Sequence, residues 1–84
     1  MTTPPTMYGA QWCKDCRRSK ALLDTLGIDY VNVDLELEPE RVEEARAIAG
    51  RQNIPVIVFD DGVVLVEPSD AELEAALTDH GLRS

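Results

Sequence analysis

The chain has 84 residues, of which 44% are apolar, and sixteen acidic against eight basic residues give it a formal net charge of -8 at pH 7. This length suits one small domain with a modest core, and the acidic charge argues against nucleic acid or an anionic membrane as a partner because both require a basic face. Residues 1–5 show no targeting pattern and no apolar run approaches membrane-spanning length, so we expect a cytoplasmic protein.

The first half of the chain predicts a strand, a helix and a second strand. Residues 6–8 form a short strand candidate after two prolines, and a loop over 9–12 follows. A helix is expected over about 13–26, because apolar residues recur along one side and Gly27 can end it. That side carries Cys16, Leu22, Leu23 and Leu26. Alternating polar and apolar residues then predict a strand over 28–35.

The second half predicts a helix, a hairpin and a last helix. Pro39 suits the first turn of a helix over about 39–49, and the apolar residues Val42, Ala45, Ile48 and Ala49 share one of its faces. Two β-branched runs, 56–59 and 63–66, are joined by an Asp-Gly turn and favour a hairpin. Ser69 with Glu72 forms a capping box for the last helix. The predicted order is therefore βαβαββα, an α/β fold.

Both cysteines of the chain lie in one Cys-x-x-Cys motif, Cys13 and Cys16, at the start of the first predicted helix. Thiols at this spacing sit about one helical turn apart and can close a small disulfide ring. The helix N-terminus favours a thiolate, which is the species that attacks a disulfide. Cys13 is therefore the expected nucleophile and Cys16 the resolving thiol. The neighbouring cations Lys14, Arg17 and Arg18 also favour the thiolate, whereas Asp15 disfavours it.

Other roles for two cysteines fit this chain less well. A structural zinc site usually needs four Cys or His ligands, and beyond the pair the only such residue in the chain is His80, so no metal is expected. A permanent disulfide would close too short a ring to constrain the unfolded chain much. Two inert buried cysteines remain an alternative, but their position at a helix start argues against it. Two cysteines in a reducing compartment favour redox chemistry.

The position of the Cys-x-x-Cys motif between the first strand and first helix, the Ile54-Pro55 pair just before the third strand and the closing hairpin and helix make the chain resemble the glutaredoxins. The resemblance covers nearly the whole chain. Within that family the run from Trp12 to Arg18 and the Pro68-Ser69 pair are most similar to actinobacterial mycoredoxins. The resemblance implies a single domain over 1–84, a thioredoxin-like fold with a four-stranded mixed sheet and three helices, and thiol-disulfide oxidoreductase activity.

The resemblance also implies a set of site residues. Cys13 and Cys16 would be catalytic, with Trp12 and Lys14 beside them in the substrate site. An X-Pro bond is usually trans, but the family pattern predicts that Ile54-Pro55 is cis and that the Ile54 backbone pairs with an extended substrate. At the last helix, the family binds the amino group of its thiol at the position of Asp70, after Ser69, although helix capping alone would explain both residues.

Three departures from the glutaredoxin pattern bear on the co-substrate. Ala10 stands where glutathione-dependent members usually carry a basic residue, Glu67-Pro68 replaces a Gly-Gly pair, and Lys14-Asp15 is an unusual motif centre. A ligand without extra carboxylates, such as mycothiol, suits an acidic protein that lacks the cation. The alternatives are a dithiol redoxin reduced by thioredoxin reductase, a glutathione-dependent glutaredoxin, or a partner- or metal-binding module with weak turnover.

The expected partners follow from these readings. They are disulfide-containing or thiolated proteins together with a small-thiol or flavoprotein reductase system. Mycothiol, or alternatively glutathione, would act as a co-substrate rather than a tightly bound cofactor. We expect the protein to act as a monomer.

Overall fold

The computed structural model describes residues 3–82. In this range the chain forms the strands and helices in the predicted order. The strands and helices are β1 (Thr6–Gly9), α1 (Lys14–Thr25), β2 (Val31–Asp34), the short 3-10 turn η1 (Pro39–Arg41), α2 (Val42–Ala49), β3 (Val56–Val58), β4 (Val64–Val66) and α3 (Asp70–Asp79). The predicted hairpin is present as the antiparallel pair β3 and β4.

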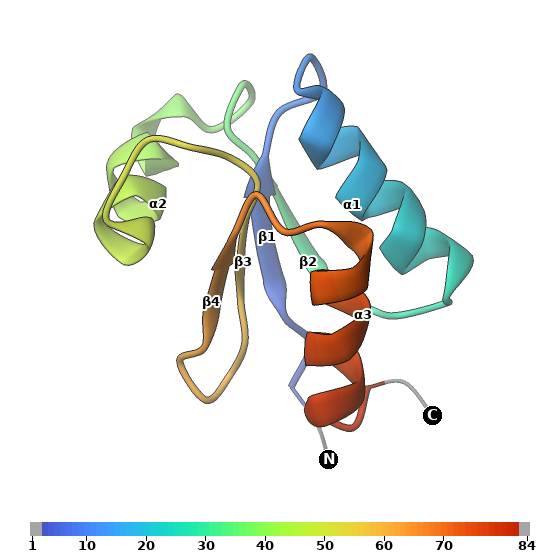
Figure 1. Cartoon of the computed structure of the whole chain (residues 1–84). Coiled ribbons are helices and arrows are strands. Elements are labelled where there is room, and N and C mark those ends of the chain that lie inside the picture. Colours follow the sequence, from blue (N-terminus) through green and yellow to red (C-terminus); the bar gives the residue numbers. More distant parts are fainter. Residues whose placement is uncertain (1–2, 83–84) are drawn as a thin grey trace.

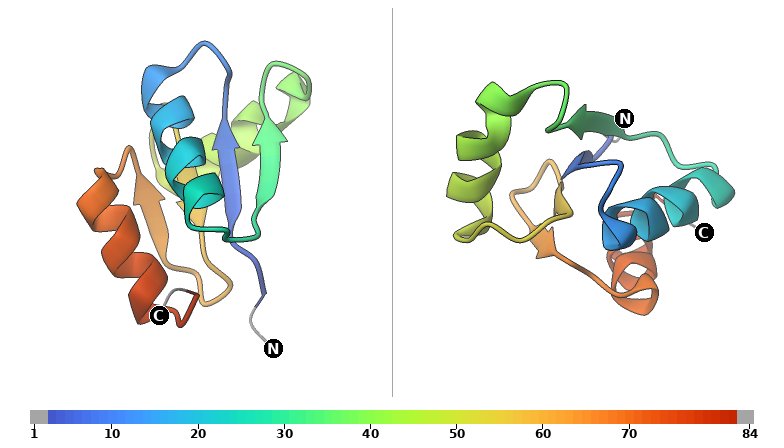
Figure 2. Two further views of the ribbon diagram at one scale, coloured as in Figure 1. Left: turned by 90° about the vertical axis from the view of Figure 1, so that its right-hand side faces the viewer. Right: turned by 90° about the horizontal axis from the view of Figure 1, so that it is seen from above.

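The four strands form one mixed sheet in the order β2-β1-β3-β4. β1 pairs with β2 in parallel and with β3 antiparallel. Helices α1 and α3 cover one face of the sheet and α2 covers the other, which is clearest in the view from above (Figure 1; Figure 2). The predicted four-stranded mixed sheet with three α-helices is confirmed, and the fold is thioredoxin-like.

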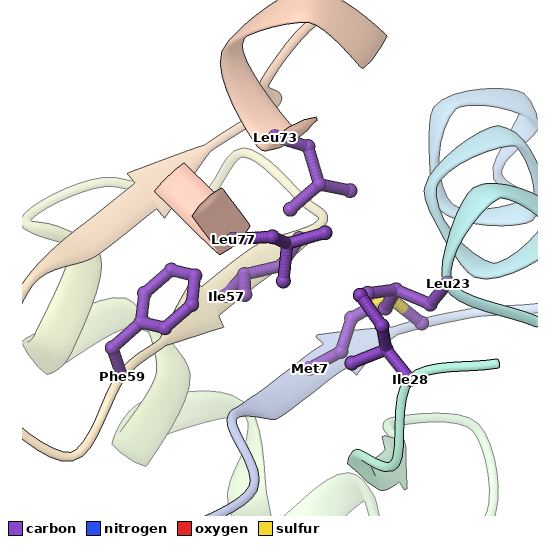
Figure 3. Packing of buried hydrophobic residues seen from close by; sticks show 7 residues of the cluster. All are labelled: Met7, Leu23, Ile28, Ile57, Phe59, Leu73 and Leu77. Carbon is purple, nitrogen blue, oxygen red and sulfur yellow. The ribbon is translucent and has the colours of Figure 1, made fainter. Parts of the chain in front are cut away.

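The central strands supply the core on both faces of the sheet. Met7 pairs with Ile57 in the register of β1 and β3, and their side chains belong to the core under α1 and α3. The neighbouring pair, Tyr8 and Val56, belongs to the core on the other face under α2, as the alternation of a strand requires. Figure 3 shows the first of these cores, in which the buried side chains are Met7, Leu23, Ile28, Ile57, Phe59, Leu73 and Leu77.

The second strand is shorter than the predicted 28–35 because the end of α1 uses the residues before it. Gly27, at φ +68°, and Ile28 donate their N–H groups to the carbonyls of Asp24 and Leu23. This pair of bonds is a Schellman motif. Ile28 is buried, as its apolar side chain predicts, but its backbone terminates the helix and β2 begins only at Val31.

The predicted helix over 39–49 starts as the 3-10 turn η1, and only part of its apolar face is covered. Ala45 is buried against the sheet, whereas Val42 and Ile48 remain 42% and 37% exposed. A helix of eight residues makes about two turns, so it presents few side chains to the sheet. The apolar face of α2 was therefore correctly placed but is less buried than its pattern predicts.

Ser19 is a buried polar residue that the sequence pattern did not single out. Its side chain is fully buried in α1, and its hydroxyl has no hydrogen-bond partner among residues 3–82. An unpaired buried hydroxyl carries a desolvation cost of about 1–3 kcal/mol. We therefore expect Ser19→Ala to raise the free energy of unfolding by about 1 kcal/mol, measured by urea denaturation. A loss of stability would show that the hydroxyl is paired in solution.

Candidate active site

Cys13 is the N-cap residue of α1, at the end of the loop that follows β1. Its backbone is extended (φ -81°, ψ 117°), and its sulfur accepts the N–H of Cys16 at 3.2 Å. The Cys13 N–H in turn donates to the Ala10 carbonyl at 3.2 Å. A sulfur that caps a helix receives both a hydrogen bond and the positive end of the helix dipole, and both favour a thiolate.

Cys16 lies one turn further into α1 and is less accessible, with 3% of its surface exposed against 9% for Cys13. Both cysteines are free thiols. Burial, and after it the hydrogen bond with Cys13, raises the pKa of Cys16 to about 12. Cys16 is therefore a protonated thiol at neutral pH, which suits a resolving role and leaves Cys13 as the group placed to attack first.

Gly9, the last residue of β1, makes room for Cys16. A Cβ atom at this position would lie 3.0 Å from the Cys16 sulfur and 3.2 Å from its Cβ, tighter than ordinary contact. Gly9 is not among the site residues predicted from the sequence. A glycine immediately before the cysteine loop was the available signal, since glycine often marks close approach of another group to the backbone.

The start of β3 brings a second element to the cysteines. Because β3 runs antiparallel to β1, the residues before β3 lie beside the residues after β1. The Ile54–Pro55 peptide bond is cis, as the family pattern predicts. The Cys13 thiol donates to the Ile54 carbonyl at 3.8 Å, and Ile54 packs against a small cluster of Ala10, Cys13 and Cys16.

A groove of about 390 Å³ lies between the cysteine loop, α2 and the segment before the cis-proline. It is lined by Ala10, Trp12, Leu35, Glu36, Val42, Glu43, Ala45, Arg46, Arg51, Gln52, Asn53, Ile54 and Val56. The Trp12 side chain at its edge is 68% exposed. Neither cysteine lines the groove, but Ala10 and Ile54 of its wall pack against both of them. A groove of mixed apolar and polar lining next to a nucleophile is typical of a small-molecule site.

The family model for glutaredoxins matches residues 6–64. The chain belongs to the glutaredoxin family. A relative from Mycobacterium tuberculosis H37Rv, whose name assigns it provisionally to the glutaredoxins, is 33% identical over 78 residues that cover 92% of this chain and 93% of the relative. As a glutaredoxin, the protein is a thiol redox protein.

Two solved structures share its fold. The glutaredoxin from Archaeoglobus fulgidus has a TM-score of 0.75 and 24% identity, and the alignment covers 89% of this chain and 85% of that one. The NrdH-redoxin of Escherichia coli has a TM-score of 0.74 and 22% identity, with coverage of 87% and 93%. Both likenesses place this glutaredoxin in the thioredoxin-like fold.

The predicted residues at the start of α3 have partners within the protein. The Ser69 hydroxyl accepts the N–H of Glu72 at 3.1 Å, and the Glu72 carboxylate accepts the Ser69 N–H at 2.9 Å, which confirms the capping box. The Asp70 carboxylate lies 3.5 Å from the Arg18 Nε on α1. Neither Ser69 nor Asp70 lines the groove, and Lys14 is exposed on the first turn of α1.

Glu67 occupies the position of a family glycine and supports the cis-proline segment. Its φ is +50°, a left-handed conformation that is uncommon outside glycine. The Glu67 N–H donates to the Pro55 carbonyl at 2.9 Å, and its carboxylate accepts the Asn53 side-chain amide at 2.6 Å. The replacement of Gly-Gly is visible in the sequence, but the hydrogen bonds that join Glu67 to the residues on both sides of Ile54 are not.

Metal and membrane features are absent from the part of the chain that the structure describes. Within residues 3–82, no three His, Cys, Asp or Glu side chains gather closely enough to hold a metal ion. In the same range, no helix combines the length and the apolarity needed to cross a bilayer.

Proposed function

We propose that this glutaredoxin reduces mixed disulfides between proteins and a low-molecular-weight thiol, and that this thiol is uncharged, of the mycothiol type. The observation that carries the proposal is the groove beside Cys13. Ala10, only 6% exposed, forms its wall at the position of the cation that binds a glutathione carboxylate. Two glutamates and two arginines line the groove, so their charges balance. A neutral sugar-linked thiol suits such a groove.

The start of α3 supports the same preference. In the family, the residue at the position of Asp70 accepts the free amino group of the thiol. Here Arg18 approaches that carboxylate at 3.5 Å, so a cation already accompanies it. The guanidinium would repel the free ammonium group of a ligand bound here. A ligand whose amine is acylated carries no charge at that point and would not be repelled.

The exchange needs only thiols and disulfides. The Cys13 thiolate attacks the small-thiol sulfur of the mixed disulfide, forms a disulfide with the small thiol and releases the protein thiolate, which takes up a proton. A second small-thiol thiolate then attacks that disulfide, and Cys13 leaves as a thiolate. The products are the reduced protein and the symmetric small-thiol disulfide, which a flavoprotein reductase would recycle.

The groove and the cis-proline segment together suit this sequence of steps. Ile54 lines the groove, and its carbonyl lies 3.8 Å from the Cys13 sulfur, within reach of an extended substrate bound there. The proposal places the protein in the reducing cytoplasm, where it would act as a monomer on disulfide-containing or thiolated proteins.

A side-by-side coupled assay tests the choice of thiol. Purified protein would receive a mixed disulfide of each thiol, with mycothiol and its reductase in one arm and glutathione and its reductase in the other. We expect faster turnover with mycothiol, because binding glutathione without the usual cation loses a charge-assisted contact of about 1.5–3 kcal/mol, or roughly tenfold to a hundredfold in affinity. Faster turnover with glutathione would overturn the mycothiol assignment and leave an ordinary glutaredoxin.

A charge variant sharpens the assay. Ala10→Lys adds a cation to the groove wall and should speed the glutathione reaction. Ala21→Lys adds the same charge on the exposed side of α1, away from the groove, and should leave the preference unchanged. Equal gains in both variants would show that the overall charge of the protein, rather than the groove, sets the preference.

A dithiol redoxin reduced directly by thioredoxin reductase is the second candidate. The shared fold with the NrdH-redoxin, whose published description reports a thioredoxin-like activity profile, favours including it. A third arm with thioredoxin reductase and NADPH detects it, because that route needs both cysteines and fails in Cys16→Ser. Absence of turnover in all three arms would instead favour a partner-binding module.

A further inference from the structure

Arg18 joins the cysteine motif to the start of α3 through three separate groups. Its Nη1 lies 3.1 Å from the Asp15 carboxylate, and its Nη2 donates to the Pro68 carbonyl at 3.1 Å. Its Nε lies 3.5 Å from the Asp70 carboxylate. A planar guanidinium binds several acceptors in fixed directions, whereas the donors of a lysine ammonium rotate about a flexible side chain. The contacts with Pro68 and Asp70 hold the guanidinium in place, and the Asp15 carboxylate pairs with it.

Asp15 is the feature of the motif that most needs such a partner. It lies between the two cysteines in sequence, in the first turn of α1. A negative charge so close to Cys13 opposes the formation of a second negative charge on the sulfur. The same carboxylate is among the causes that raise the pKa of Cys16, after burial and the hydrogen bond with Cys13.

We propose that Arg18 is a positioning residue that lets a carboxylate occupy the interior of the Cys-x-x-Cys motif without suppressing the Cys13 thiolate. It does so by pairing with Asp15 and by anchoring that pair to Pro68, just before α3, and to Asp70, the first residue of α3. The inference rests on the thiol-disulfide chemistry of the proposed function but not on the identity of the small thiol.

Substitutions at Asp15 and Arg18 leave the other charged groups near Cys13 unchanged. Lys14 and Arg17 lie on the same helix, and Arg17 donates to the Gln11 carbonyl at 2.8 Å. Glu36, from the segment after β2, accepts the Gln11 N–H at 3.0 Å. On the Ile54 side the Cys13 thiol meets a carbonyl, and the adjoining groove carries the charged residues Glu43, Arg46 and Arg51, which no variant changes. A set of variants at Asp15 and Arg18 alone therefore isolates their effect.

The test is a double-mutant cycle read by alkylation. The reduced wild type, Arg18→Gln, Asp15→Asn and the double variant would be treated with iodoacetamide between pH 4 and 10 at low ionic strength, with the first adduct followed by intact mass. Arg18→Gln should slow alkylation at pH 7 by about threefold to tenfold and move the midpoint of the pH profile upward, because Asp15 is left without its partner. Asp15→Asn should speed alkylation, and the double variant should regain at least the wild-type rate.

The cycle separates an electrostatic role from a merely structural one. Arg18→Gln also removes the contacts of Arg18 with Pro68 and Asp70, so the free energy of unfolding should fall. Adding Asp15→Asn should restore the alkylation rate but not this loss of stability. Lys20→Gln is the matched control, because Lys20 pairs with Asp24 on the exposed side of the same helix and should alkylate as the wild type does. Arg18→Lys keeps the charge with fewer contacts, so its alkylation rate should lie between those of the wild type and Arg18→Gln. It takes the place of Arg18→Gln in the cycle if that variant folds poorly.

Two outcomes would overturn the proposal. One is unchanged alkylation in Arg18→Gln, and the other is a double variant as slow as Arg18→Gln. Alkylation requires no reductase and no second thiol, so either result is independent of the coupled assay that tests the proposed function.

Discussion

Replacing Cys13 with serine should reduce thiol-disulfide exchange to the uncatalysed rate, whereas replacing Cys16 with serine should preserve the reduction of small-thiol mixed disulfides. Cys13 is the more exposed of the two residues, and its sulfur accepts the Cys16 N–H at the start of α1. Cys16 is buried, and its pKa of about 12 keeps it protonated at neutral pH. The measurement is turnover of a mixed-disulfide substrate with a small thiol and its reductase, run in parallel for both variants.

The two variants also differ in what they retain. Cys16→Ser should accumulate disulfide-linked complexes between Cys13 and protein substrates, because the resolving thiol is missing, and non-reducing gels would show them. Ser19→Ala is a suitable control, since it changes a buried residue of the same helix without touching either thiol. Equal activity in the two cysteine variants would contradict the assigned roles, and equal loss in both would leave only a two-thiol mechanism.

The element order could be predicted because its boundaries are local. Gly27 ends α1, the Asp-Gly turn joins β3 to β4, and Ser69 with Glu72 starts α3, and each of these signals acts within a few residues. The details that differed depend on packing. Ile28 reads as the first residue of a strand but serves the end of α1, and the exposure of Val42 depends on how α2 lies against the sheet.

The site was predictable only in part for the same reason. The Cys-x-x-Cys spacing and its helix position follow from the residues, but the cis bond before Pro55 was expected from family resemblance alone. The contacts of Arg18 with Pro68 and of Glu67 with Asn53 join residues that are 50 and 14 positions apart. No periodicity or local propensity encodes such pairs, because only the packing of α3 against α1 and β4 against β3 brings them together.

The second large effect concerns the side chain that anchors the cysteine-bearing helix. Leu23 is fully buried, and it projects from α1 into the core shared with Met7 of β1 and Leu73 of α3 (Figure 3). Leu23→Ala should lower the free energy of unfolding by about 2–5 kcal/mol, because it removes buried methyl groups and leaves a cavity. For a small domain this is a large share of a total of about 5–15 kcal/mol. Urea denaturation followed by circular dichroism measures the change.

Leu37→Ala is the matched control for that loss. It makes the same chemical change at a side chain that is 79% exposed, so its effect should stay within about 0.5 kcal/mol. The Cys16 N–H that bonds to the Cys13 sulfur lies at the other end of α1 from Leu23. If Leu23 only stabilises the fold, the folded Leu23→Ala variant at low temperature should therefore be alkylated at Cys13 as fast as the wild type. A loss below about 1 kcal/mol would contradict the packing in Figure 3. Slow alkylation in the folded variant would mean that the Leu23 contact also sets the position of the cysteine loop.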